Sequence, residues 1–331
     1  MIVRAGEAQR ALAKSPLVVL LIFIAVVAGG ETKASAGGRW LQPVSAREAS
    51  AFWTPTRMRA AKPVEVGAPG RRGPAIVGDG GKRSPRVAAL AGPSSAFGLD
   101  SVPVPDSTAP EYRIHGVIFL SAGIFGYGRC SGTAVRSRNR SVVVTAAHCL
   151  NTGGPGDRWF PGKAVFVPGY RFGQRPFGVF PVRWIDTTRQ WRASGSENFD
   201  VGAMLVGRNK RGQLLGEAVG GAGIAWNRKA KQVFDVYGYP AEEPFDGETQ
   251  RVCGGRPFLG HDPSSFVMPG PLNLAVSCSL NGGSSGGGWL IEGNTLNSVT
   301  SYGYFDETSP AFGAYFGNEV ARLYGRAERM R

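Results

Sequence analysis

Histidine is scarce in the sequence, and one of the three histidines stands where a general base could be held firmly. His148 lies in the stretch "VVVTAAHCL" (142–150), after an apolar run and directly before a cysteine. A general base must lie within hydrogen-bond reach, about 3 Å, of the proton that it takes. The end of a strand beside a bridged cysteine would hold an imidazole that firmly. His115 and His261 stand beside turn-forming residues, and we expect both at the surface or in loops.

A carboxylate that could orient this imidazole is that of Asp200. It comes directly after Phe199 and before the apolar run "VGAMLV" (201–206), so it would begin a strand at the edge of the core. A solvated aspartate at a strand end is the alternative explanation of the same pattern. Asp200 is therefore the candidate partner of the general base.

The stretch "NGGSSGGGW" (281–289) has two opposite interpretations. Glycine and serine in this proportion are typical of a flexible linker, but they also suit a tight turn that presents one serine as a nucleophile. Strand-like runs flank the stretch, "LNLAVSC" (272–278) before it and "GWLI" (288–291) after it. A linker would be out of place inside a folded body, so we interpret the stretch as a turn. Ser284 and Ser285 are then the candidate nucleophiles.

From about residue 113 the chain consists of short apolar or alternating runs bounded by glycine, proline and asparagine. Runs of this length and spacing predict an all-β fold of the sandwich or barrel type. Besides the runs named above, the expected strands are 116–121, 141–146, 164–168, 178–185, 232–239 and 298–304. One helical pattern is predicted at 318–330, with Val320, Leu323 and Tyr324 on one face.

Four motifs follow one another along this part of the chain: "CSGTAV" (130–135), "TAAHC" (145–149), "NFDVGAMLV" (198–206) and "GGSSGGG" (282–288). In combination they resemble the trypsin/chymotrypsin-like serine peptidases, in particular the secreted bacterial branch that includes the glutamyl endopeptidases. The resemblance covers roughly residues 113–325, and its order His…Asp…Ser is that of chymotrypsin. It implies two packed six-stranded antiparallel β-barrels with a C-terminal helix. The N-barrel would span about 113–215 and the C-barrel about 216–331.

The resemblance also implies roles for three residues. His148 would be the general base, Asp200 would hold its tautomer through the other ring nitrogen, and Ser285 would attack the peptide carbonyl. Ser285 is preferred over Ser284 because the pattern G-x-S-G-G requires a glycine after the nucleophile. The backbone N–H groups of Gly283 and Ser285 would stabilise the oxyanion, each by roughly 3 kcal/mol. No cofactor or metal is required, and proteins or peptides would be the substrates.

The residue before this nucleophile departs from the animal-type pattern, in which an aspartate pairs with the amino terminus made by activation cleavage. Here that residue is Ser284, which carries no charge. The stretch "YRIHG" (112–116) resembles an activation site with Arg113–Ile114 as its bond. An ammonium group inserted beside Ser284 would lack a partner in the interior. We therefore predict that activity needs no defined terminus at Ile114.

The positions that resemble the substrate pocket carry no charged residue. They are Ser279, Thr300, Ser301, Tyr302 and Gly303. The first would lie near the pocket floor, the last two would form one wall, and Ser301 would hydrogen-bond near Asp200. Thr300 occupies the place where glutamate-specific relatives carry a histidine. We expect a neutral, small or apolar residue on the acyl side of the cleaved bond, unless the loop 255–270 shapes the pocket differently.

Four cysteines come after the N-terminal segment, and an even number in an exported chain favours disulfides. Three pairings are possible, and pairing of neighbours, Cys130–Cys149 and Cys253–Cys278, would place one bridge in each half. Closing a loop of about 20 residues in this way contributes roughly 3 kcal/mol. A zinc site on His148 and Cys149 is the competing interpretation. Adjacent residues at a strand end point apart, however, and no further ligand pair has metal-site spacing.

The N-terminus has the parts of an export signal. Positively charged residues precede an apolar run (16–30), and the small residues "ASA" (34–36) offer a cleavage site. Residues 1–36 are therefore interpreted as a signal peptide. An uncleaved membrane anchor is the alternative, although the run is short for a spanning helix. Both interpretations place the body of the protein outside the cytoplasm, secreted or periplasmic.

Residues 37–112 differ in composition from the strand-rich part of the chain that begins at about residue 113. They contain ten prolines among alanine, glycine, serine and arginine, and only "VAAL" (87–90) interrupts this pattern. Such a segment cannot bury enough apolar area to offset the entropy lost on ordering. We predict a disordered linker or pro-segment here.

The net charge of +14 raises the question of nucleic-acid binding. The positive charge is spread along the chain, and no basic helix or basic stripe interleaved with aromatic residues concentrates it. We therefore expect no nucleic-acid partner. We also expect a monomer, with membrane contact only if the N-terminal segment stays uncleaved.

Two other function classes compete with a peptidase. A non-catalytic binding module would share the fold, and an esterase-like hydrolase is disfavoured by the order His…Asp…Ser.

Overall fold

The computed structural model describes residues 37–64, 101–121, 126–160, 162–303 and 310–331. The predicted signal or anchor, residues 1–36, lies outside these ranges. Within them, no helix has the length and apolar character needed to cross a membrane.

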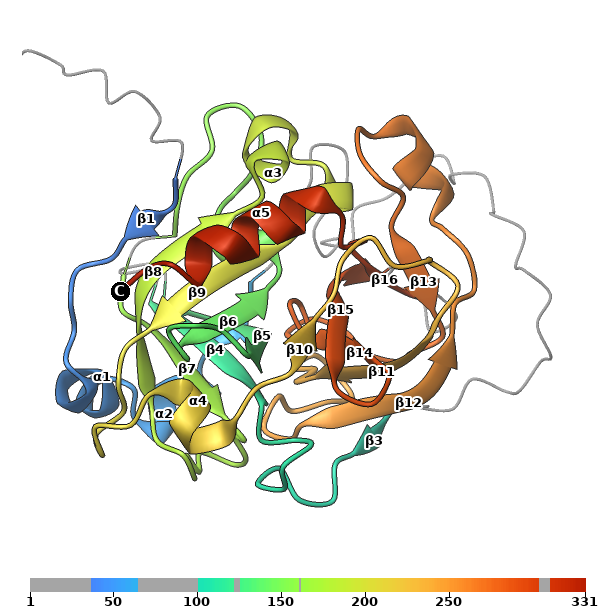
Figure 1. The fold of residues 1–331 in the computed structure, drawn as a ribbon. Helices are drawn as coiled ribbons and strands as arrows, with labels where there is room; N and C mark the ends of the chain where they lie inside the picture. The colour runs from blue at the N-terminus through green and yellow to red at the C-terminus, as the bar shows by residue number, and fades with distance from the viewer. Residues whose placement is uncertain (1–36, 65–100, 122–125, 161, 304–309) are drawn as a thin grey trace, which may run out of the picture. The chain divides into compact units, whose positions relative to one another are not determined.

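Six antiparallel strands form a closed barrel (Figure 1). They are β4 (His115–Ser121), β5 (Tyr127–Val135), β6 (Val142–Thr145), β7 (Ala164–Pro168), β8 (Phe180–Thr187) and β9 (Gly202–Val206). The spatial order is β8-β7-β4-β5-β6-β9, and β9 pairs again with β8, which closes the barrel. Because successive residues of a strand point to opposite faces, residues such as Ile118, Phe166 and Trp184 gather in one buried core.

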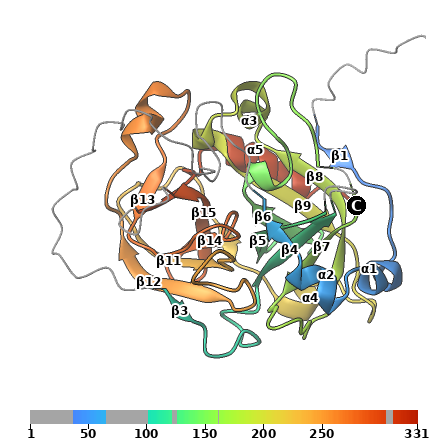
Figure 2. The same cartoon turned by 180° about the vertical axis from the view of Figure 1, so that it is seen from behind.

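Six further strands form a second, curled sheet in the order β13-β16-β15-β14-β11-β12 (Figures 1 and 2). They are β11 (Val233–Gly238), β12 (Arg251–Pro257), β13 (Leu274–Val276), β14 (Gly288–Ile291), β15 (Thr295–Gly303) and β16 (Ala311–Gly313). Two short strands extend it, β3 (Val102–Pro103) beside β12 and β10 (Gly223–Ile224) beside β15. An isolated bridge between Gly260 and Ala275 links its two ends. The two-barrel prediction is confirmed, and the second barrel is a curled half-barrel.

The predicted C-terminal helix is confirmed as α5 (Asn318–Ala327), three residues shorter than the pattern at 318–330 suggests. It follows the second sheet in the chain but packs on β8 and β9 of the first barrel. Val320 and Leu323 are buried, and Nε of Arg326 donates to buried Asp186 on β8 at 2.7 Å. Among the described residues of the two-barrel region, the other helical elements are α3 (Arg189–Ser194), α4 (Leu215–Val219) and the 3-10 turns η2 (Ala147–Cys149), η3 (Glu197–Phe199) and η4 (Pro263–Val267).

Part of the proline-rich segment is ordered, which differs from the predicted disorder over 37–112. Its first part forms β1 (Arg39–Trp40), α1 (Ala46–Phe52), α2 (Pro55–Arg59) and β2 (Lys62–Pro63). Ser45 and Thr54 cap the two helices. The prediction rested on proline and glycine content, whereas Trp53 and Met58 are wholly buried against the first barrel and supply the missing apolar area. Residues 65–100 lie outside the described ranges.

Candidate active site

The His148 side chain lies where the first barrel passes from β6 into η2. The strand ends at Thr145, and the single turn of η2 holds His148 in a buried position. The next residue, Cys149, is joined to Cys130 on β5 by a disulfide. The backbone beside the imidazole is thereby fixed to a neighbouring strand, which gives the rigid mount that a general base needs.

Asp200 is wholly buried beside this imidazole, between η3 and β9. Its Oδ2 is 2.7 Å from Nδ1 of His148, and its Oδ1 accepts the backbone N–H of His148 at 2.8 Å. From the second sheet, Ser301 on β15 donates its hydroxyl to the same Oδ2 at 2.5 Å. A carboxylate held in this way fixes the orientation of the ring and the proton on Nδ1. Nε2 is left as the ring nitrogen that can accept a proton.

The stretch around Ser285 is a tight turn between two elements of the second sheet. Gly283 and Gly286 have φ values of 94° and 81°, in the left-handed region that favours glycine. A side chain on Gly286 would collide with Oγ1 of Thr145, so the turn lies directly against the end of β6 that leads into η2. Ser131 on β5 also holds the turn, since its backbone N–H donates to the carbonyl of Ser285 at 2.8 Å. The Ser285 turn and η2 therefore lie close together.

The two serines of the turn have different surroundings. Ser284 is wholly buried, its side chain lies against Gly238 on β11, and its Oγ has no hydrogen-bond partner among the described residues. Ser285 is partly exposed. A nucleophile has to reach its substrate, so these surroundings favour Ser285 over Ser284.

Two backbone N–H groups of the turn, those of Gly283 and Ser285, have no acceptor in the part of the chain that the structure describes. The amides next to them are occupied, since those of Ser284 and Gly286 donate to backbone carbonyls at 3.1 and 2.8 Å. Oγ of Ser131 donates to the carbonyl of Gly283 at 2.9 Å and holds this peptide group in place. Two unoccupied amides beside a candidate nucleophile can stabilise a developing oxyanion.

Four of the five predicted pocket positions lie in a row at the end of β15. They are Thr300, Ser301, Tyr302 and Gly303. Thr300 is buried, and its Oγ1 accepts the indole N–H of Trp289 at 2.9 Å. The ring of Tyr302 stacks on Phe312 with centroids 4.9 Å apart, and Gly303 is exposed. Ser301 connects this row to the candidate catalytic residues through its hydrogen bond to Asp200.

The fifth predicted pocket position, Ser279, is hydrogen-bonded to the proline-rich segment. The N–H of Ser101 donates to Oγ of Ser279 at 3.0 Å, and Oγ of Ser101 donates to the Ser279 carbonyl at 3.1 Å. Nε of Arg251 on β12 in turn donates to Oγ of Ser101 at 3.0 Å. The sequence does not reveal the role of Ser101, because the composition of residues 37–112 is that of a linker. The alternation in "SVPVP" (101–105) is the signal that could have indicated a strand there.

The loop 255–270, the alternative determinant of the pocket shape in the sequence-based prediction, packs on the segment that carries Asp200. Asn198 and Ser196, just before Asp200, donate side-chain hydrogen bonds to carbonyls of the loop at 3.0 and 2.9 Å. At the tip of η4 the side chain of Phe266 is exposed. The loop therefore borders the site on the side of the carboxylate.

His115 is an interior residue, and the prediction that it lies at the surface or in a loop is wrong. Only 2% of it is exposed, its Nδ1 is 2.9 Å from Oγ1 of Thr133, and its ring stacks on Tyr237 at 4.0 Å. Burial lowers the pKa of His115 to about 3. The residue opens β4, and its stacking partner lies on β11, so it packs between the two sheets. His261 lies partly exposed in a loop, as expected.

The four cysteines form two disulfides, Cys130–Cys149 and Cys253–Cys278, which is the pairing of neighbours. Ligand atoms of Cys130, Cys149 and His148 do lie within 4.8 Å of one another. Both sulfurs of this group are bonded to each other, however, and cannot offer the thiolates that zinc binds. The geometry gives no support to the zinc interpretation.

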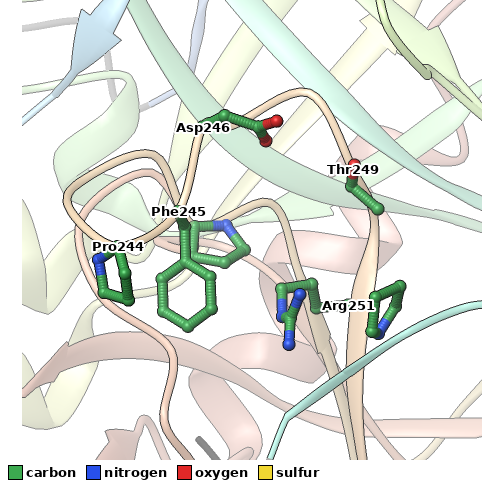
Figure 3. Close-up of a pocket in the computed structure, with 7 residues that line it drawn as sticks. Pro244, Phe245, Asp246, Thr249 and Arg251 are labelled. Atoms are coloured by element: carbon green, nitrogen blue, oxygen red, sulfur yellow. The ribbon is translucent and has the colours of Figure 1, made fainter.

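A separate hollow lies beside β3 and the chain that leads into β12 (Figure 3). This cavity of about 160 Å³ is lined by Pro103, Pro240, Pro244, Phe245, Asp246, Thr249 and Arg251. The guanidinium of Arg251 lies over the ring of Phe245, 4.8 Å from its centroid. Its lining includes none of the candidate catalytic residues, so we assign it no part in the chemistry.

No family model and no curated relative matches the chain. Solved structures do match it. The protease Anisep from Arthrobacter nicotinovorans is 31% identical, with 66% of this chain and 96% of Anisep covered and a TM-score of 0.59. The thermostable serine protease AL20 from an extremophilic microorganism is 32% identical, with 67% of this chain and 100% of AL20 covered and a TM-score of 0.61.

A Glu endopeptidase is 16% identical, with 70% of this chain and 97% of that protein covered and a TM-score of 0.54, a likeness that concerns the fold alone. Anisep and AL20, by contrast, exceed 30% identity over nearly their whole lengths. They share the two-barrel fold to which the motifs of the sequence point. The chain therefore belongs to the trypsin/chymotrypsin-like serine peptidases.

Proposed function

We propose that the protein is an exported serine endopeptidase that cleaves peptide bonds with His148, Asp200 and Ser285. The observation that carries this proposal is the buried carboxylate of Asp200, hydrogen-bonded to the ring of His148 beside a glycine turn that presents Ser285. The protease relatives support the class of reaction and proteins or peptides as substrates. The geometry of the site supports the assignment of the residues.

In the proposed reaction, Oγ of Ser285 attacks the carbonyl carbon of the peptide bond while Nε2 of His148 takes its proton. The N–H groups of Gly283 and Ser285 stabilise the negative charge that forms on the carbonyl oxygen. His148 then gives the proton to the leaving amine, the C–N bond breaks, and an ester on Ser285 remains. A water molecule then attacks the ester carbonyl carbon and gives a proton to Nε2 of His148. The bond between Oγ of Ser285 and the acyl carbon breaks, His148 returns the proton to that oxygen, and the acid product leaves.

The acyl-side preference that we propose is for a neutral, small or apolar residue. In support, Ser279 and Thr300 carry no charge, and their hydroxyls are already hydrogen-bonded to Ser101 and Trp289. Cleavage of a peptide library by the purified protein tests this preference. Cleavage confined to bonds after glutamate, or after lysine and arginine, would contradict it.

Export is supported by the two disulfides, because such bonds persist in oxidising compartments. The signal-like residues 1–36 point the same way. Recovery of the protein from the culture medium with a terminus after Ala36 would support export. A chain that stays in the cytoplasm with reduced cysteines would contradict it.

The catalytic assignment is tested by peptide hydrolysis with the purified protein and its Ser285→Ala variant. The variant should lose at least about 10⁴-fold in kcat, because removal of a triad nucleophile leaves little more than binding and oxyanion stabilisation. Its Tm should stay close to that of the wild type. A non-catalytic binding module, the alternative, would bind peptides without turnover in both forms.

A further inference from the structure

Residues 37–64, here called the N-terminal clip, bind the first barrel at two separate strand edges. At one end β1 pairs antiparallel with β8, where Trp40 lies opposite Trp184. At the other end β2 pairs in parallel with β5, and the N–H of Val64 donates to the carbonyl of Arg129 at 3.0 Å. The clip thus adds a strand to each of two barrel strands.

These additions fill edges that the barrel itself leaves open. On β8, the strand β7 pairs with Phe180 and Pro181, which come before the residues of β8 that pair with β1. On β5, the strand β6 pairs with Thr133 to Val135, which come after the residues of β5 that pair with β2. Strand addition of this kind supplies backbone hydrogen bonds as it does in peptide recognition. Without the clip, both edges would be open to solvent and to other chains.

Between β1 and β2 the clip covers an apolar patch on the outside of the barrel. Trp53 and Met58 are wholly buried, and the ring centroid of Trp53 lies 5.6 Å from that of Phe119 on β4. Nη1 of Arg175 donates to the carbonyl of Trp53 at 3.0 Å. The patch that these anchors cover consists of Val117, Phe119, Val165, Val167, Tyr170 and Val179. Tryptophan is one of the residues enriched among those that carry most of the binding energy at interfaces between separate chains.

The clip is not a plug in the candidate active site. Among the described residues, no hydrogen bond, ion pair or ring contact joins it to His148, Asp200 or Ser285. In both views α1 lies on the side of the first barrel that faces away from the second sheet (Figures 1 and 2). A pro-segment that inhibits by occupying a substrate cleft would have to contact the residues of that cleft.

We propose that the clip is a permanent part of the enzyme, held by its own contacts, so that a cut anywhere within 65–100 leaves a two-chain protein with residues 37–64 still bound. The occupant of the apolar patch is thus a segment of this same chain, and the segment is not a removable inhibitor. The proposal concerns the outside of the first barrel and does not depend on the assignment of Ser285.

A full-length chain with one inserted recognition site for a sequence-specific protease, placed within 65–100, tests the proposal. After complete cleavage we expect the fragment with residues 37–64 to co-elute with the larger fragment in size-exclusion chromatography. Peptide hydrolysis should stay within twofold of the uncut protein. The Tm of the cut protein should fall on dilution, because mass action then holds the two fragments together, whereas the Tm of the uncut protein should not.

Trp53→Ala and Val102→Ala form a matched pair, since Trp53 is the buried anchor and Val102 is an exposed residue of β3 outside the clip. The cut W53A protein should release the fragment, and the cut V102A protein should retain it. If W53A does not fold, Met58→Ala replaces it as a smaller truncation at the other wholly buried residue of the clip.

Release of the fragment from the cut wild-type protein, with the Tm of the remainder unchanged, would overturn the proposal. A rise in hydrolysis on release would also overturn it, because that is the behaviour of an inhibitory pro-segment. If the protein proves to have no hydrolytic activity, co-elution and the dilution dependence of Tm still decide between the outcomes, so failure of the proposed function is distinguishable from failure of this inference.

Discussion

At the scale of single residues, the hydrogen bonds of Asp200 are the feature on which the proposed chemistry depends most. The carboxylate is closed off from water, and its Oδ2 is shared by the ring of His148 and the hydroxyl of Ser301. Hydrogen bonds to a charged group are stronger in such surroundings than at the surface. Loss of one donor should therefore be measurable in the reaction.

Ser301→Ala removes one donor to Asp200 and leaves the three proposed catalytic residues in place. We expect kcat/KM to fall about 10- to 100-fold, since a hydrogen bond to a charged group contributes about 1.5–3 kcal/mol. The matched control is Ser298→Ala on the same strand, whose Oγ bonds to the carbonyl of Ala314. It should lower Tm without changing kcat/KM. An S301A variant with unchanged kcat/KM would show that this donor plays no part in catalysis.

His115 is a residue at which stability should depend on pH. Burial lowers its pKa to about 3, whereas an unfolded chain protonates histidine at about 6.5. The unfolded state therefore binds the proton first, and the stability is complete above about pH 6.5 and is lost as the pH falls toward 3. At pH 5 the loss is about 2 kcal/mol.

Thermal unfolding between pH 7 and pH 4 measures this effect. The His115→Gln variant should show a flatter decrease of Tm with falling pH than the wild type. Equal slopes in the two proteins would mean that His115 is not the group responsible.

The candidate catalytic residues could be predicted from the sequence because each stands in a short motif beside an apolar strand. His148 follows "VVVTAA", and Asp200 precedes "VGAMLV". The meeting of Ser279 with Ser101 could not be predicted, because it depends on a segment that returns to the second sheet from far away in the chain. The burial of His115 could not be predicted either, because its turn-like neighbours give no sign of the stacking partner Tyr237.

At the scale of elements, the disulfide Cys130–Cys149 connects the parts that the site needs. It joins η2 to β5, and Ser131, the next residue on β5, binds the carbonyl of Ser285 and that of Gly283. One cross-link therefore positions both the general base and the turn of the nucleophile. The Cys253–Cys278 disulfide lies within the second sheet and packs in a separate core.

Removing each disulfide by a double Cys→Ala substitution separates its structural role from its role in the site. Both variants should lose roughly 3 kcal/mol in the free energy of unfolding, measured by urea denaturation. We expect the variant without Cys130–Cys149 to lose kcat as well, at a temperature where both variants are folded. An equal kcat in the two variants would contradict the positioning role.

Strands with clear alternation lie near their predicted places, whereas the sequence pattern does not predict β5, β12 and β16. β5 is buried along most of its length and consists largely of small and polar residues, so it shows no alternation. β12 has the sequence "RVCGGRP", with two glycines and two arginines, and it is a strand because it pairs with β11 and β3. β16 has three residues, too few for a pattern. Pairing between distant segments defines these strands.

At the scale of the whole molecule, the candidate site exists only where the two sheets pack together. His148 and Asp200 belong to the first barrel, while Ser285 and Ser301 belong to the second sheet. The chain before the first barrel is also part of the fold, because β3 extends the second sheet and the clip covers the first barrel. Activity should therefore require both halves to be folded, and it should not require cleavage of the chain inside the folded body.

The intact chain should be active without a new terminus at Ile114. Ile114 is buried within the continuous chain, its carbonyl accepts the N–H of Ala134 at 2.8 Å, and Ser284 offers no carboxylate to an inserted ammonium. The Arg113→Gln variant, in which the bond before Ile114 no longer follows a basic residue, should keep the wild-type kcat/KM. Mass spectrometry of the active protein should show the Arg113–Ile114 bond intact. Activity confined to chains that begin at Ile114 would contradict this prediction.

Covalent labelling with a fluorophosphonate probe is the sharpest test of the proposed triad, because such probes react with an activated serine. Peptide mapping of the labelled protein should find the adduct on Ser285. Labelling should disappear in Ser285→Ala and persist in Ser284→Ala, whose altered side chain is buried against Gly238. An adduct on Ser284, or a folded wild-type protein that takes up no label, would contradict the proposed triad.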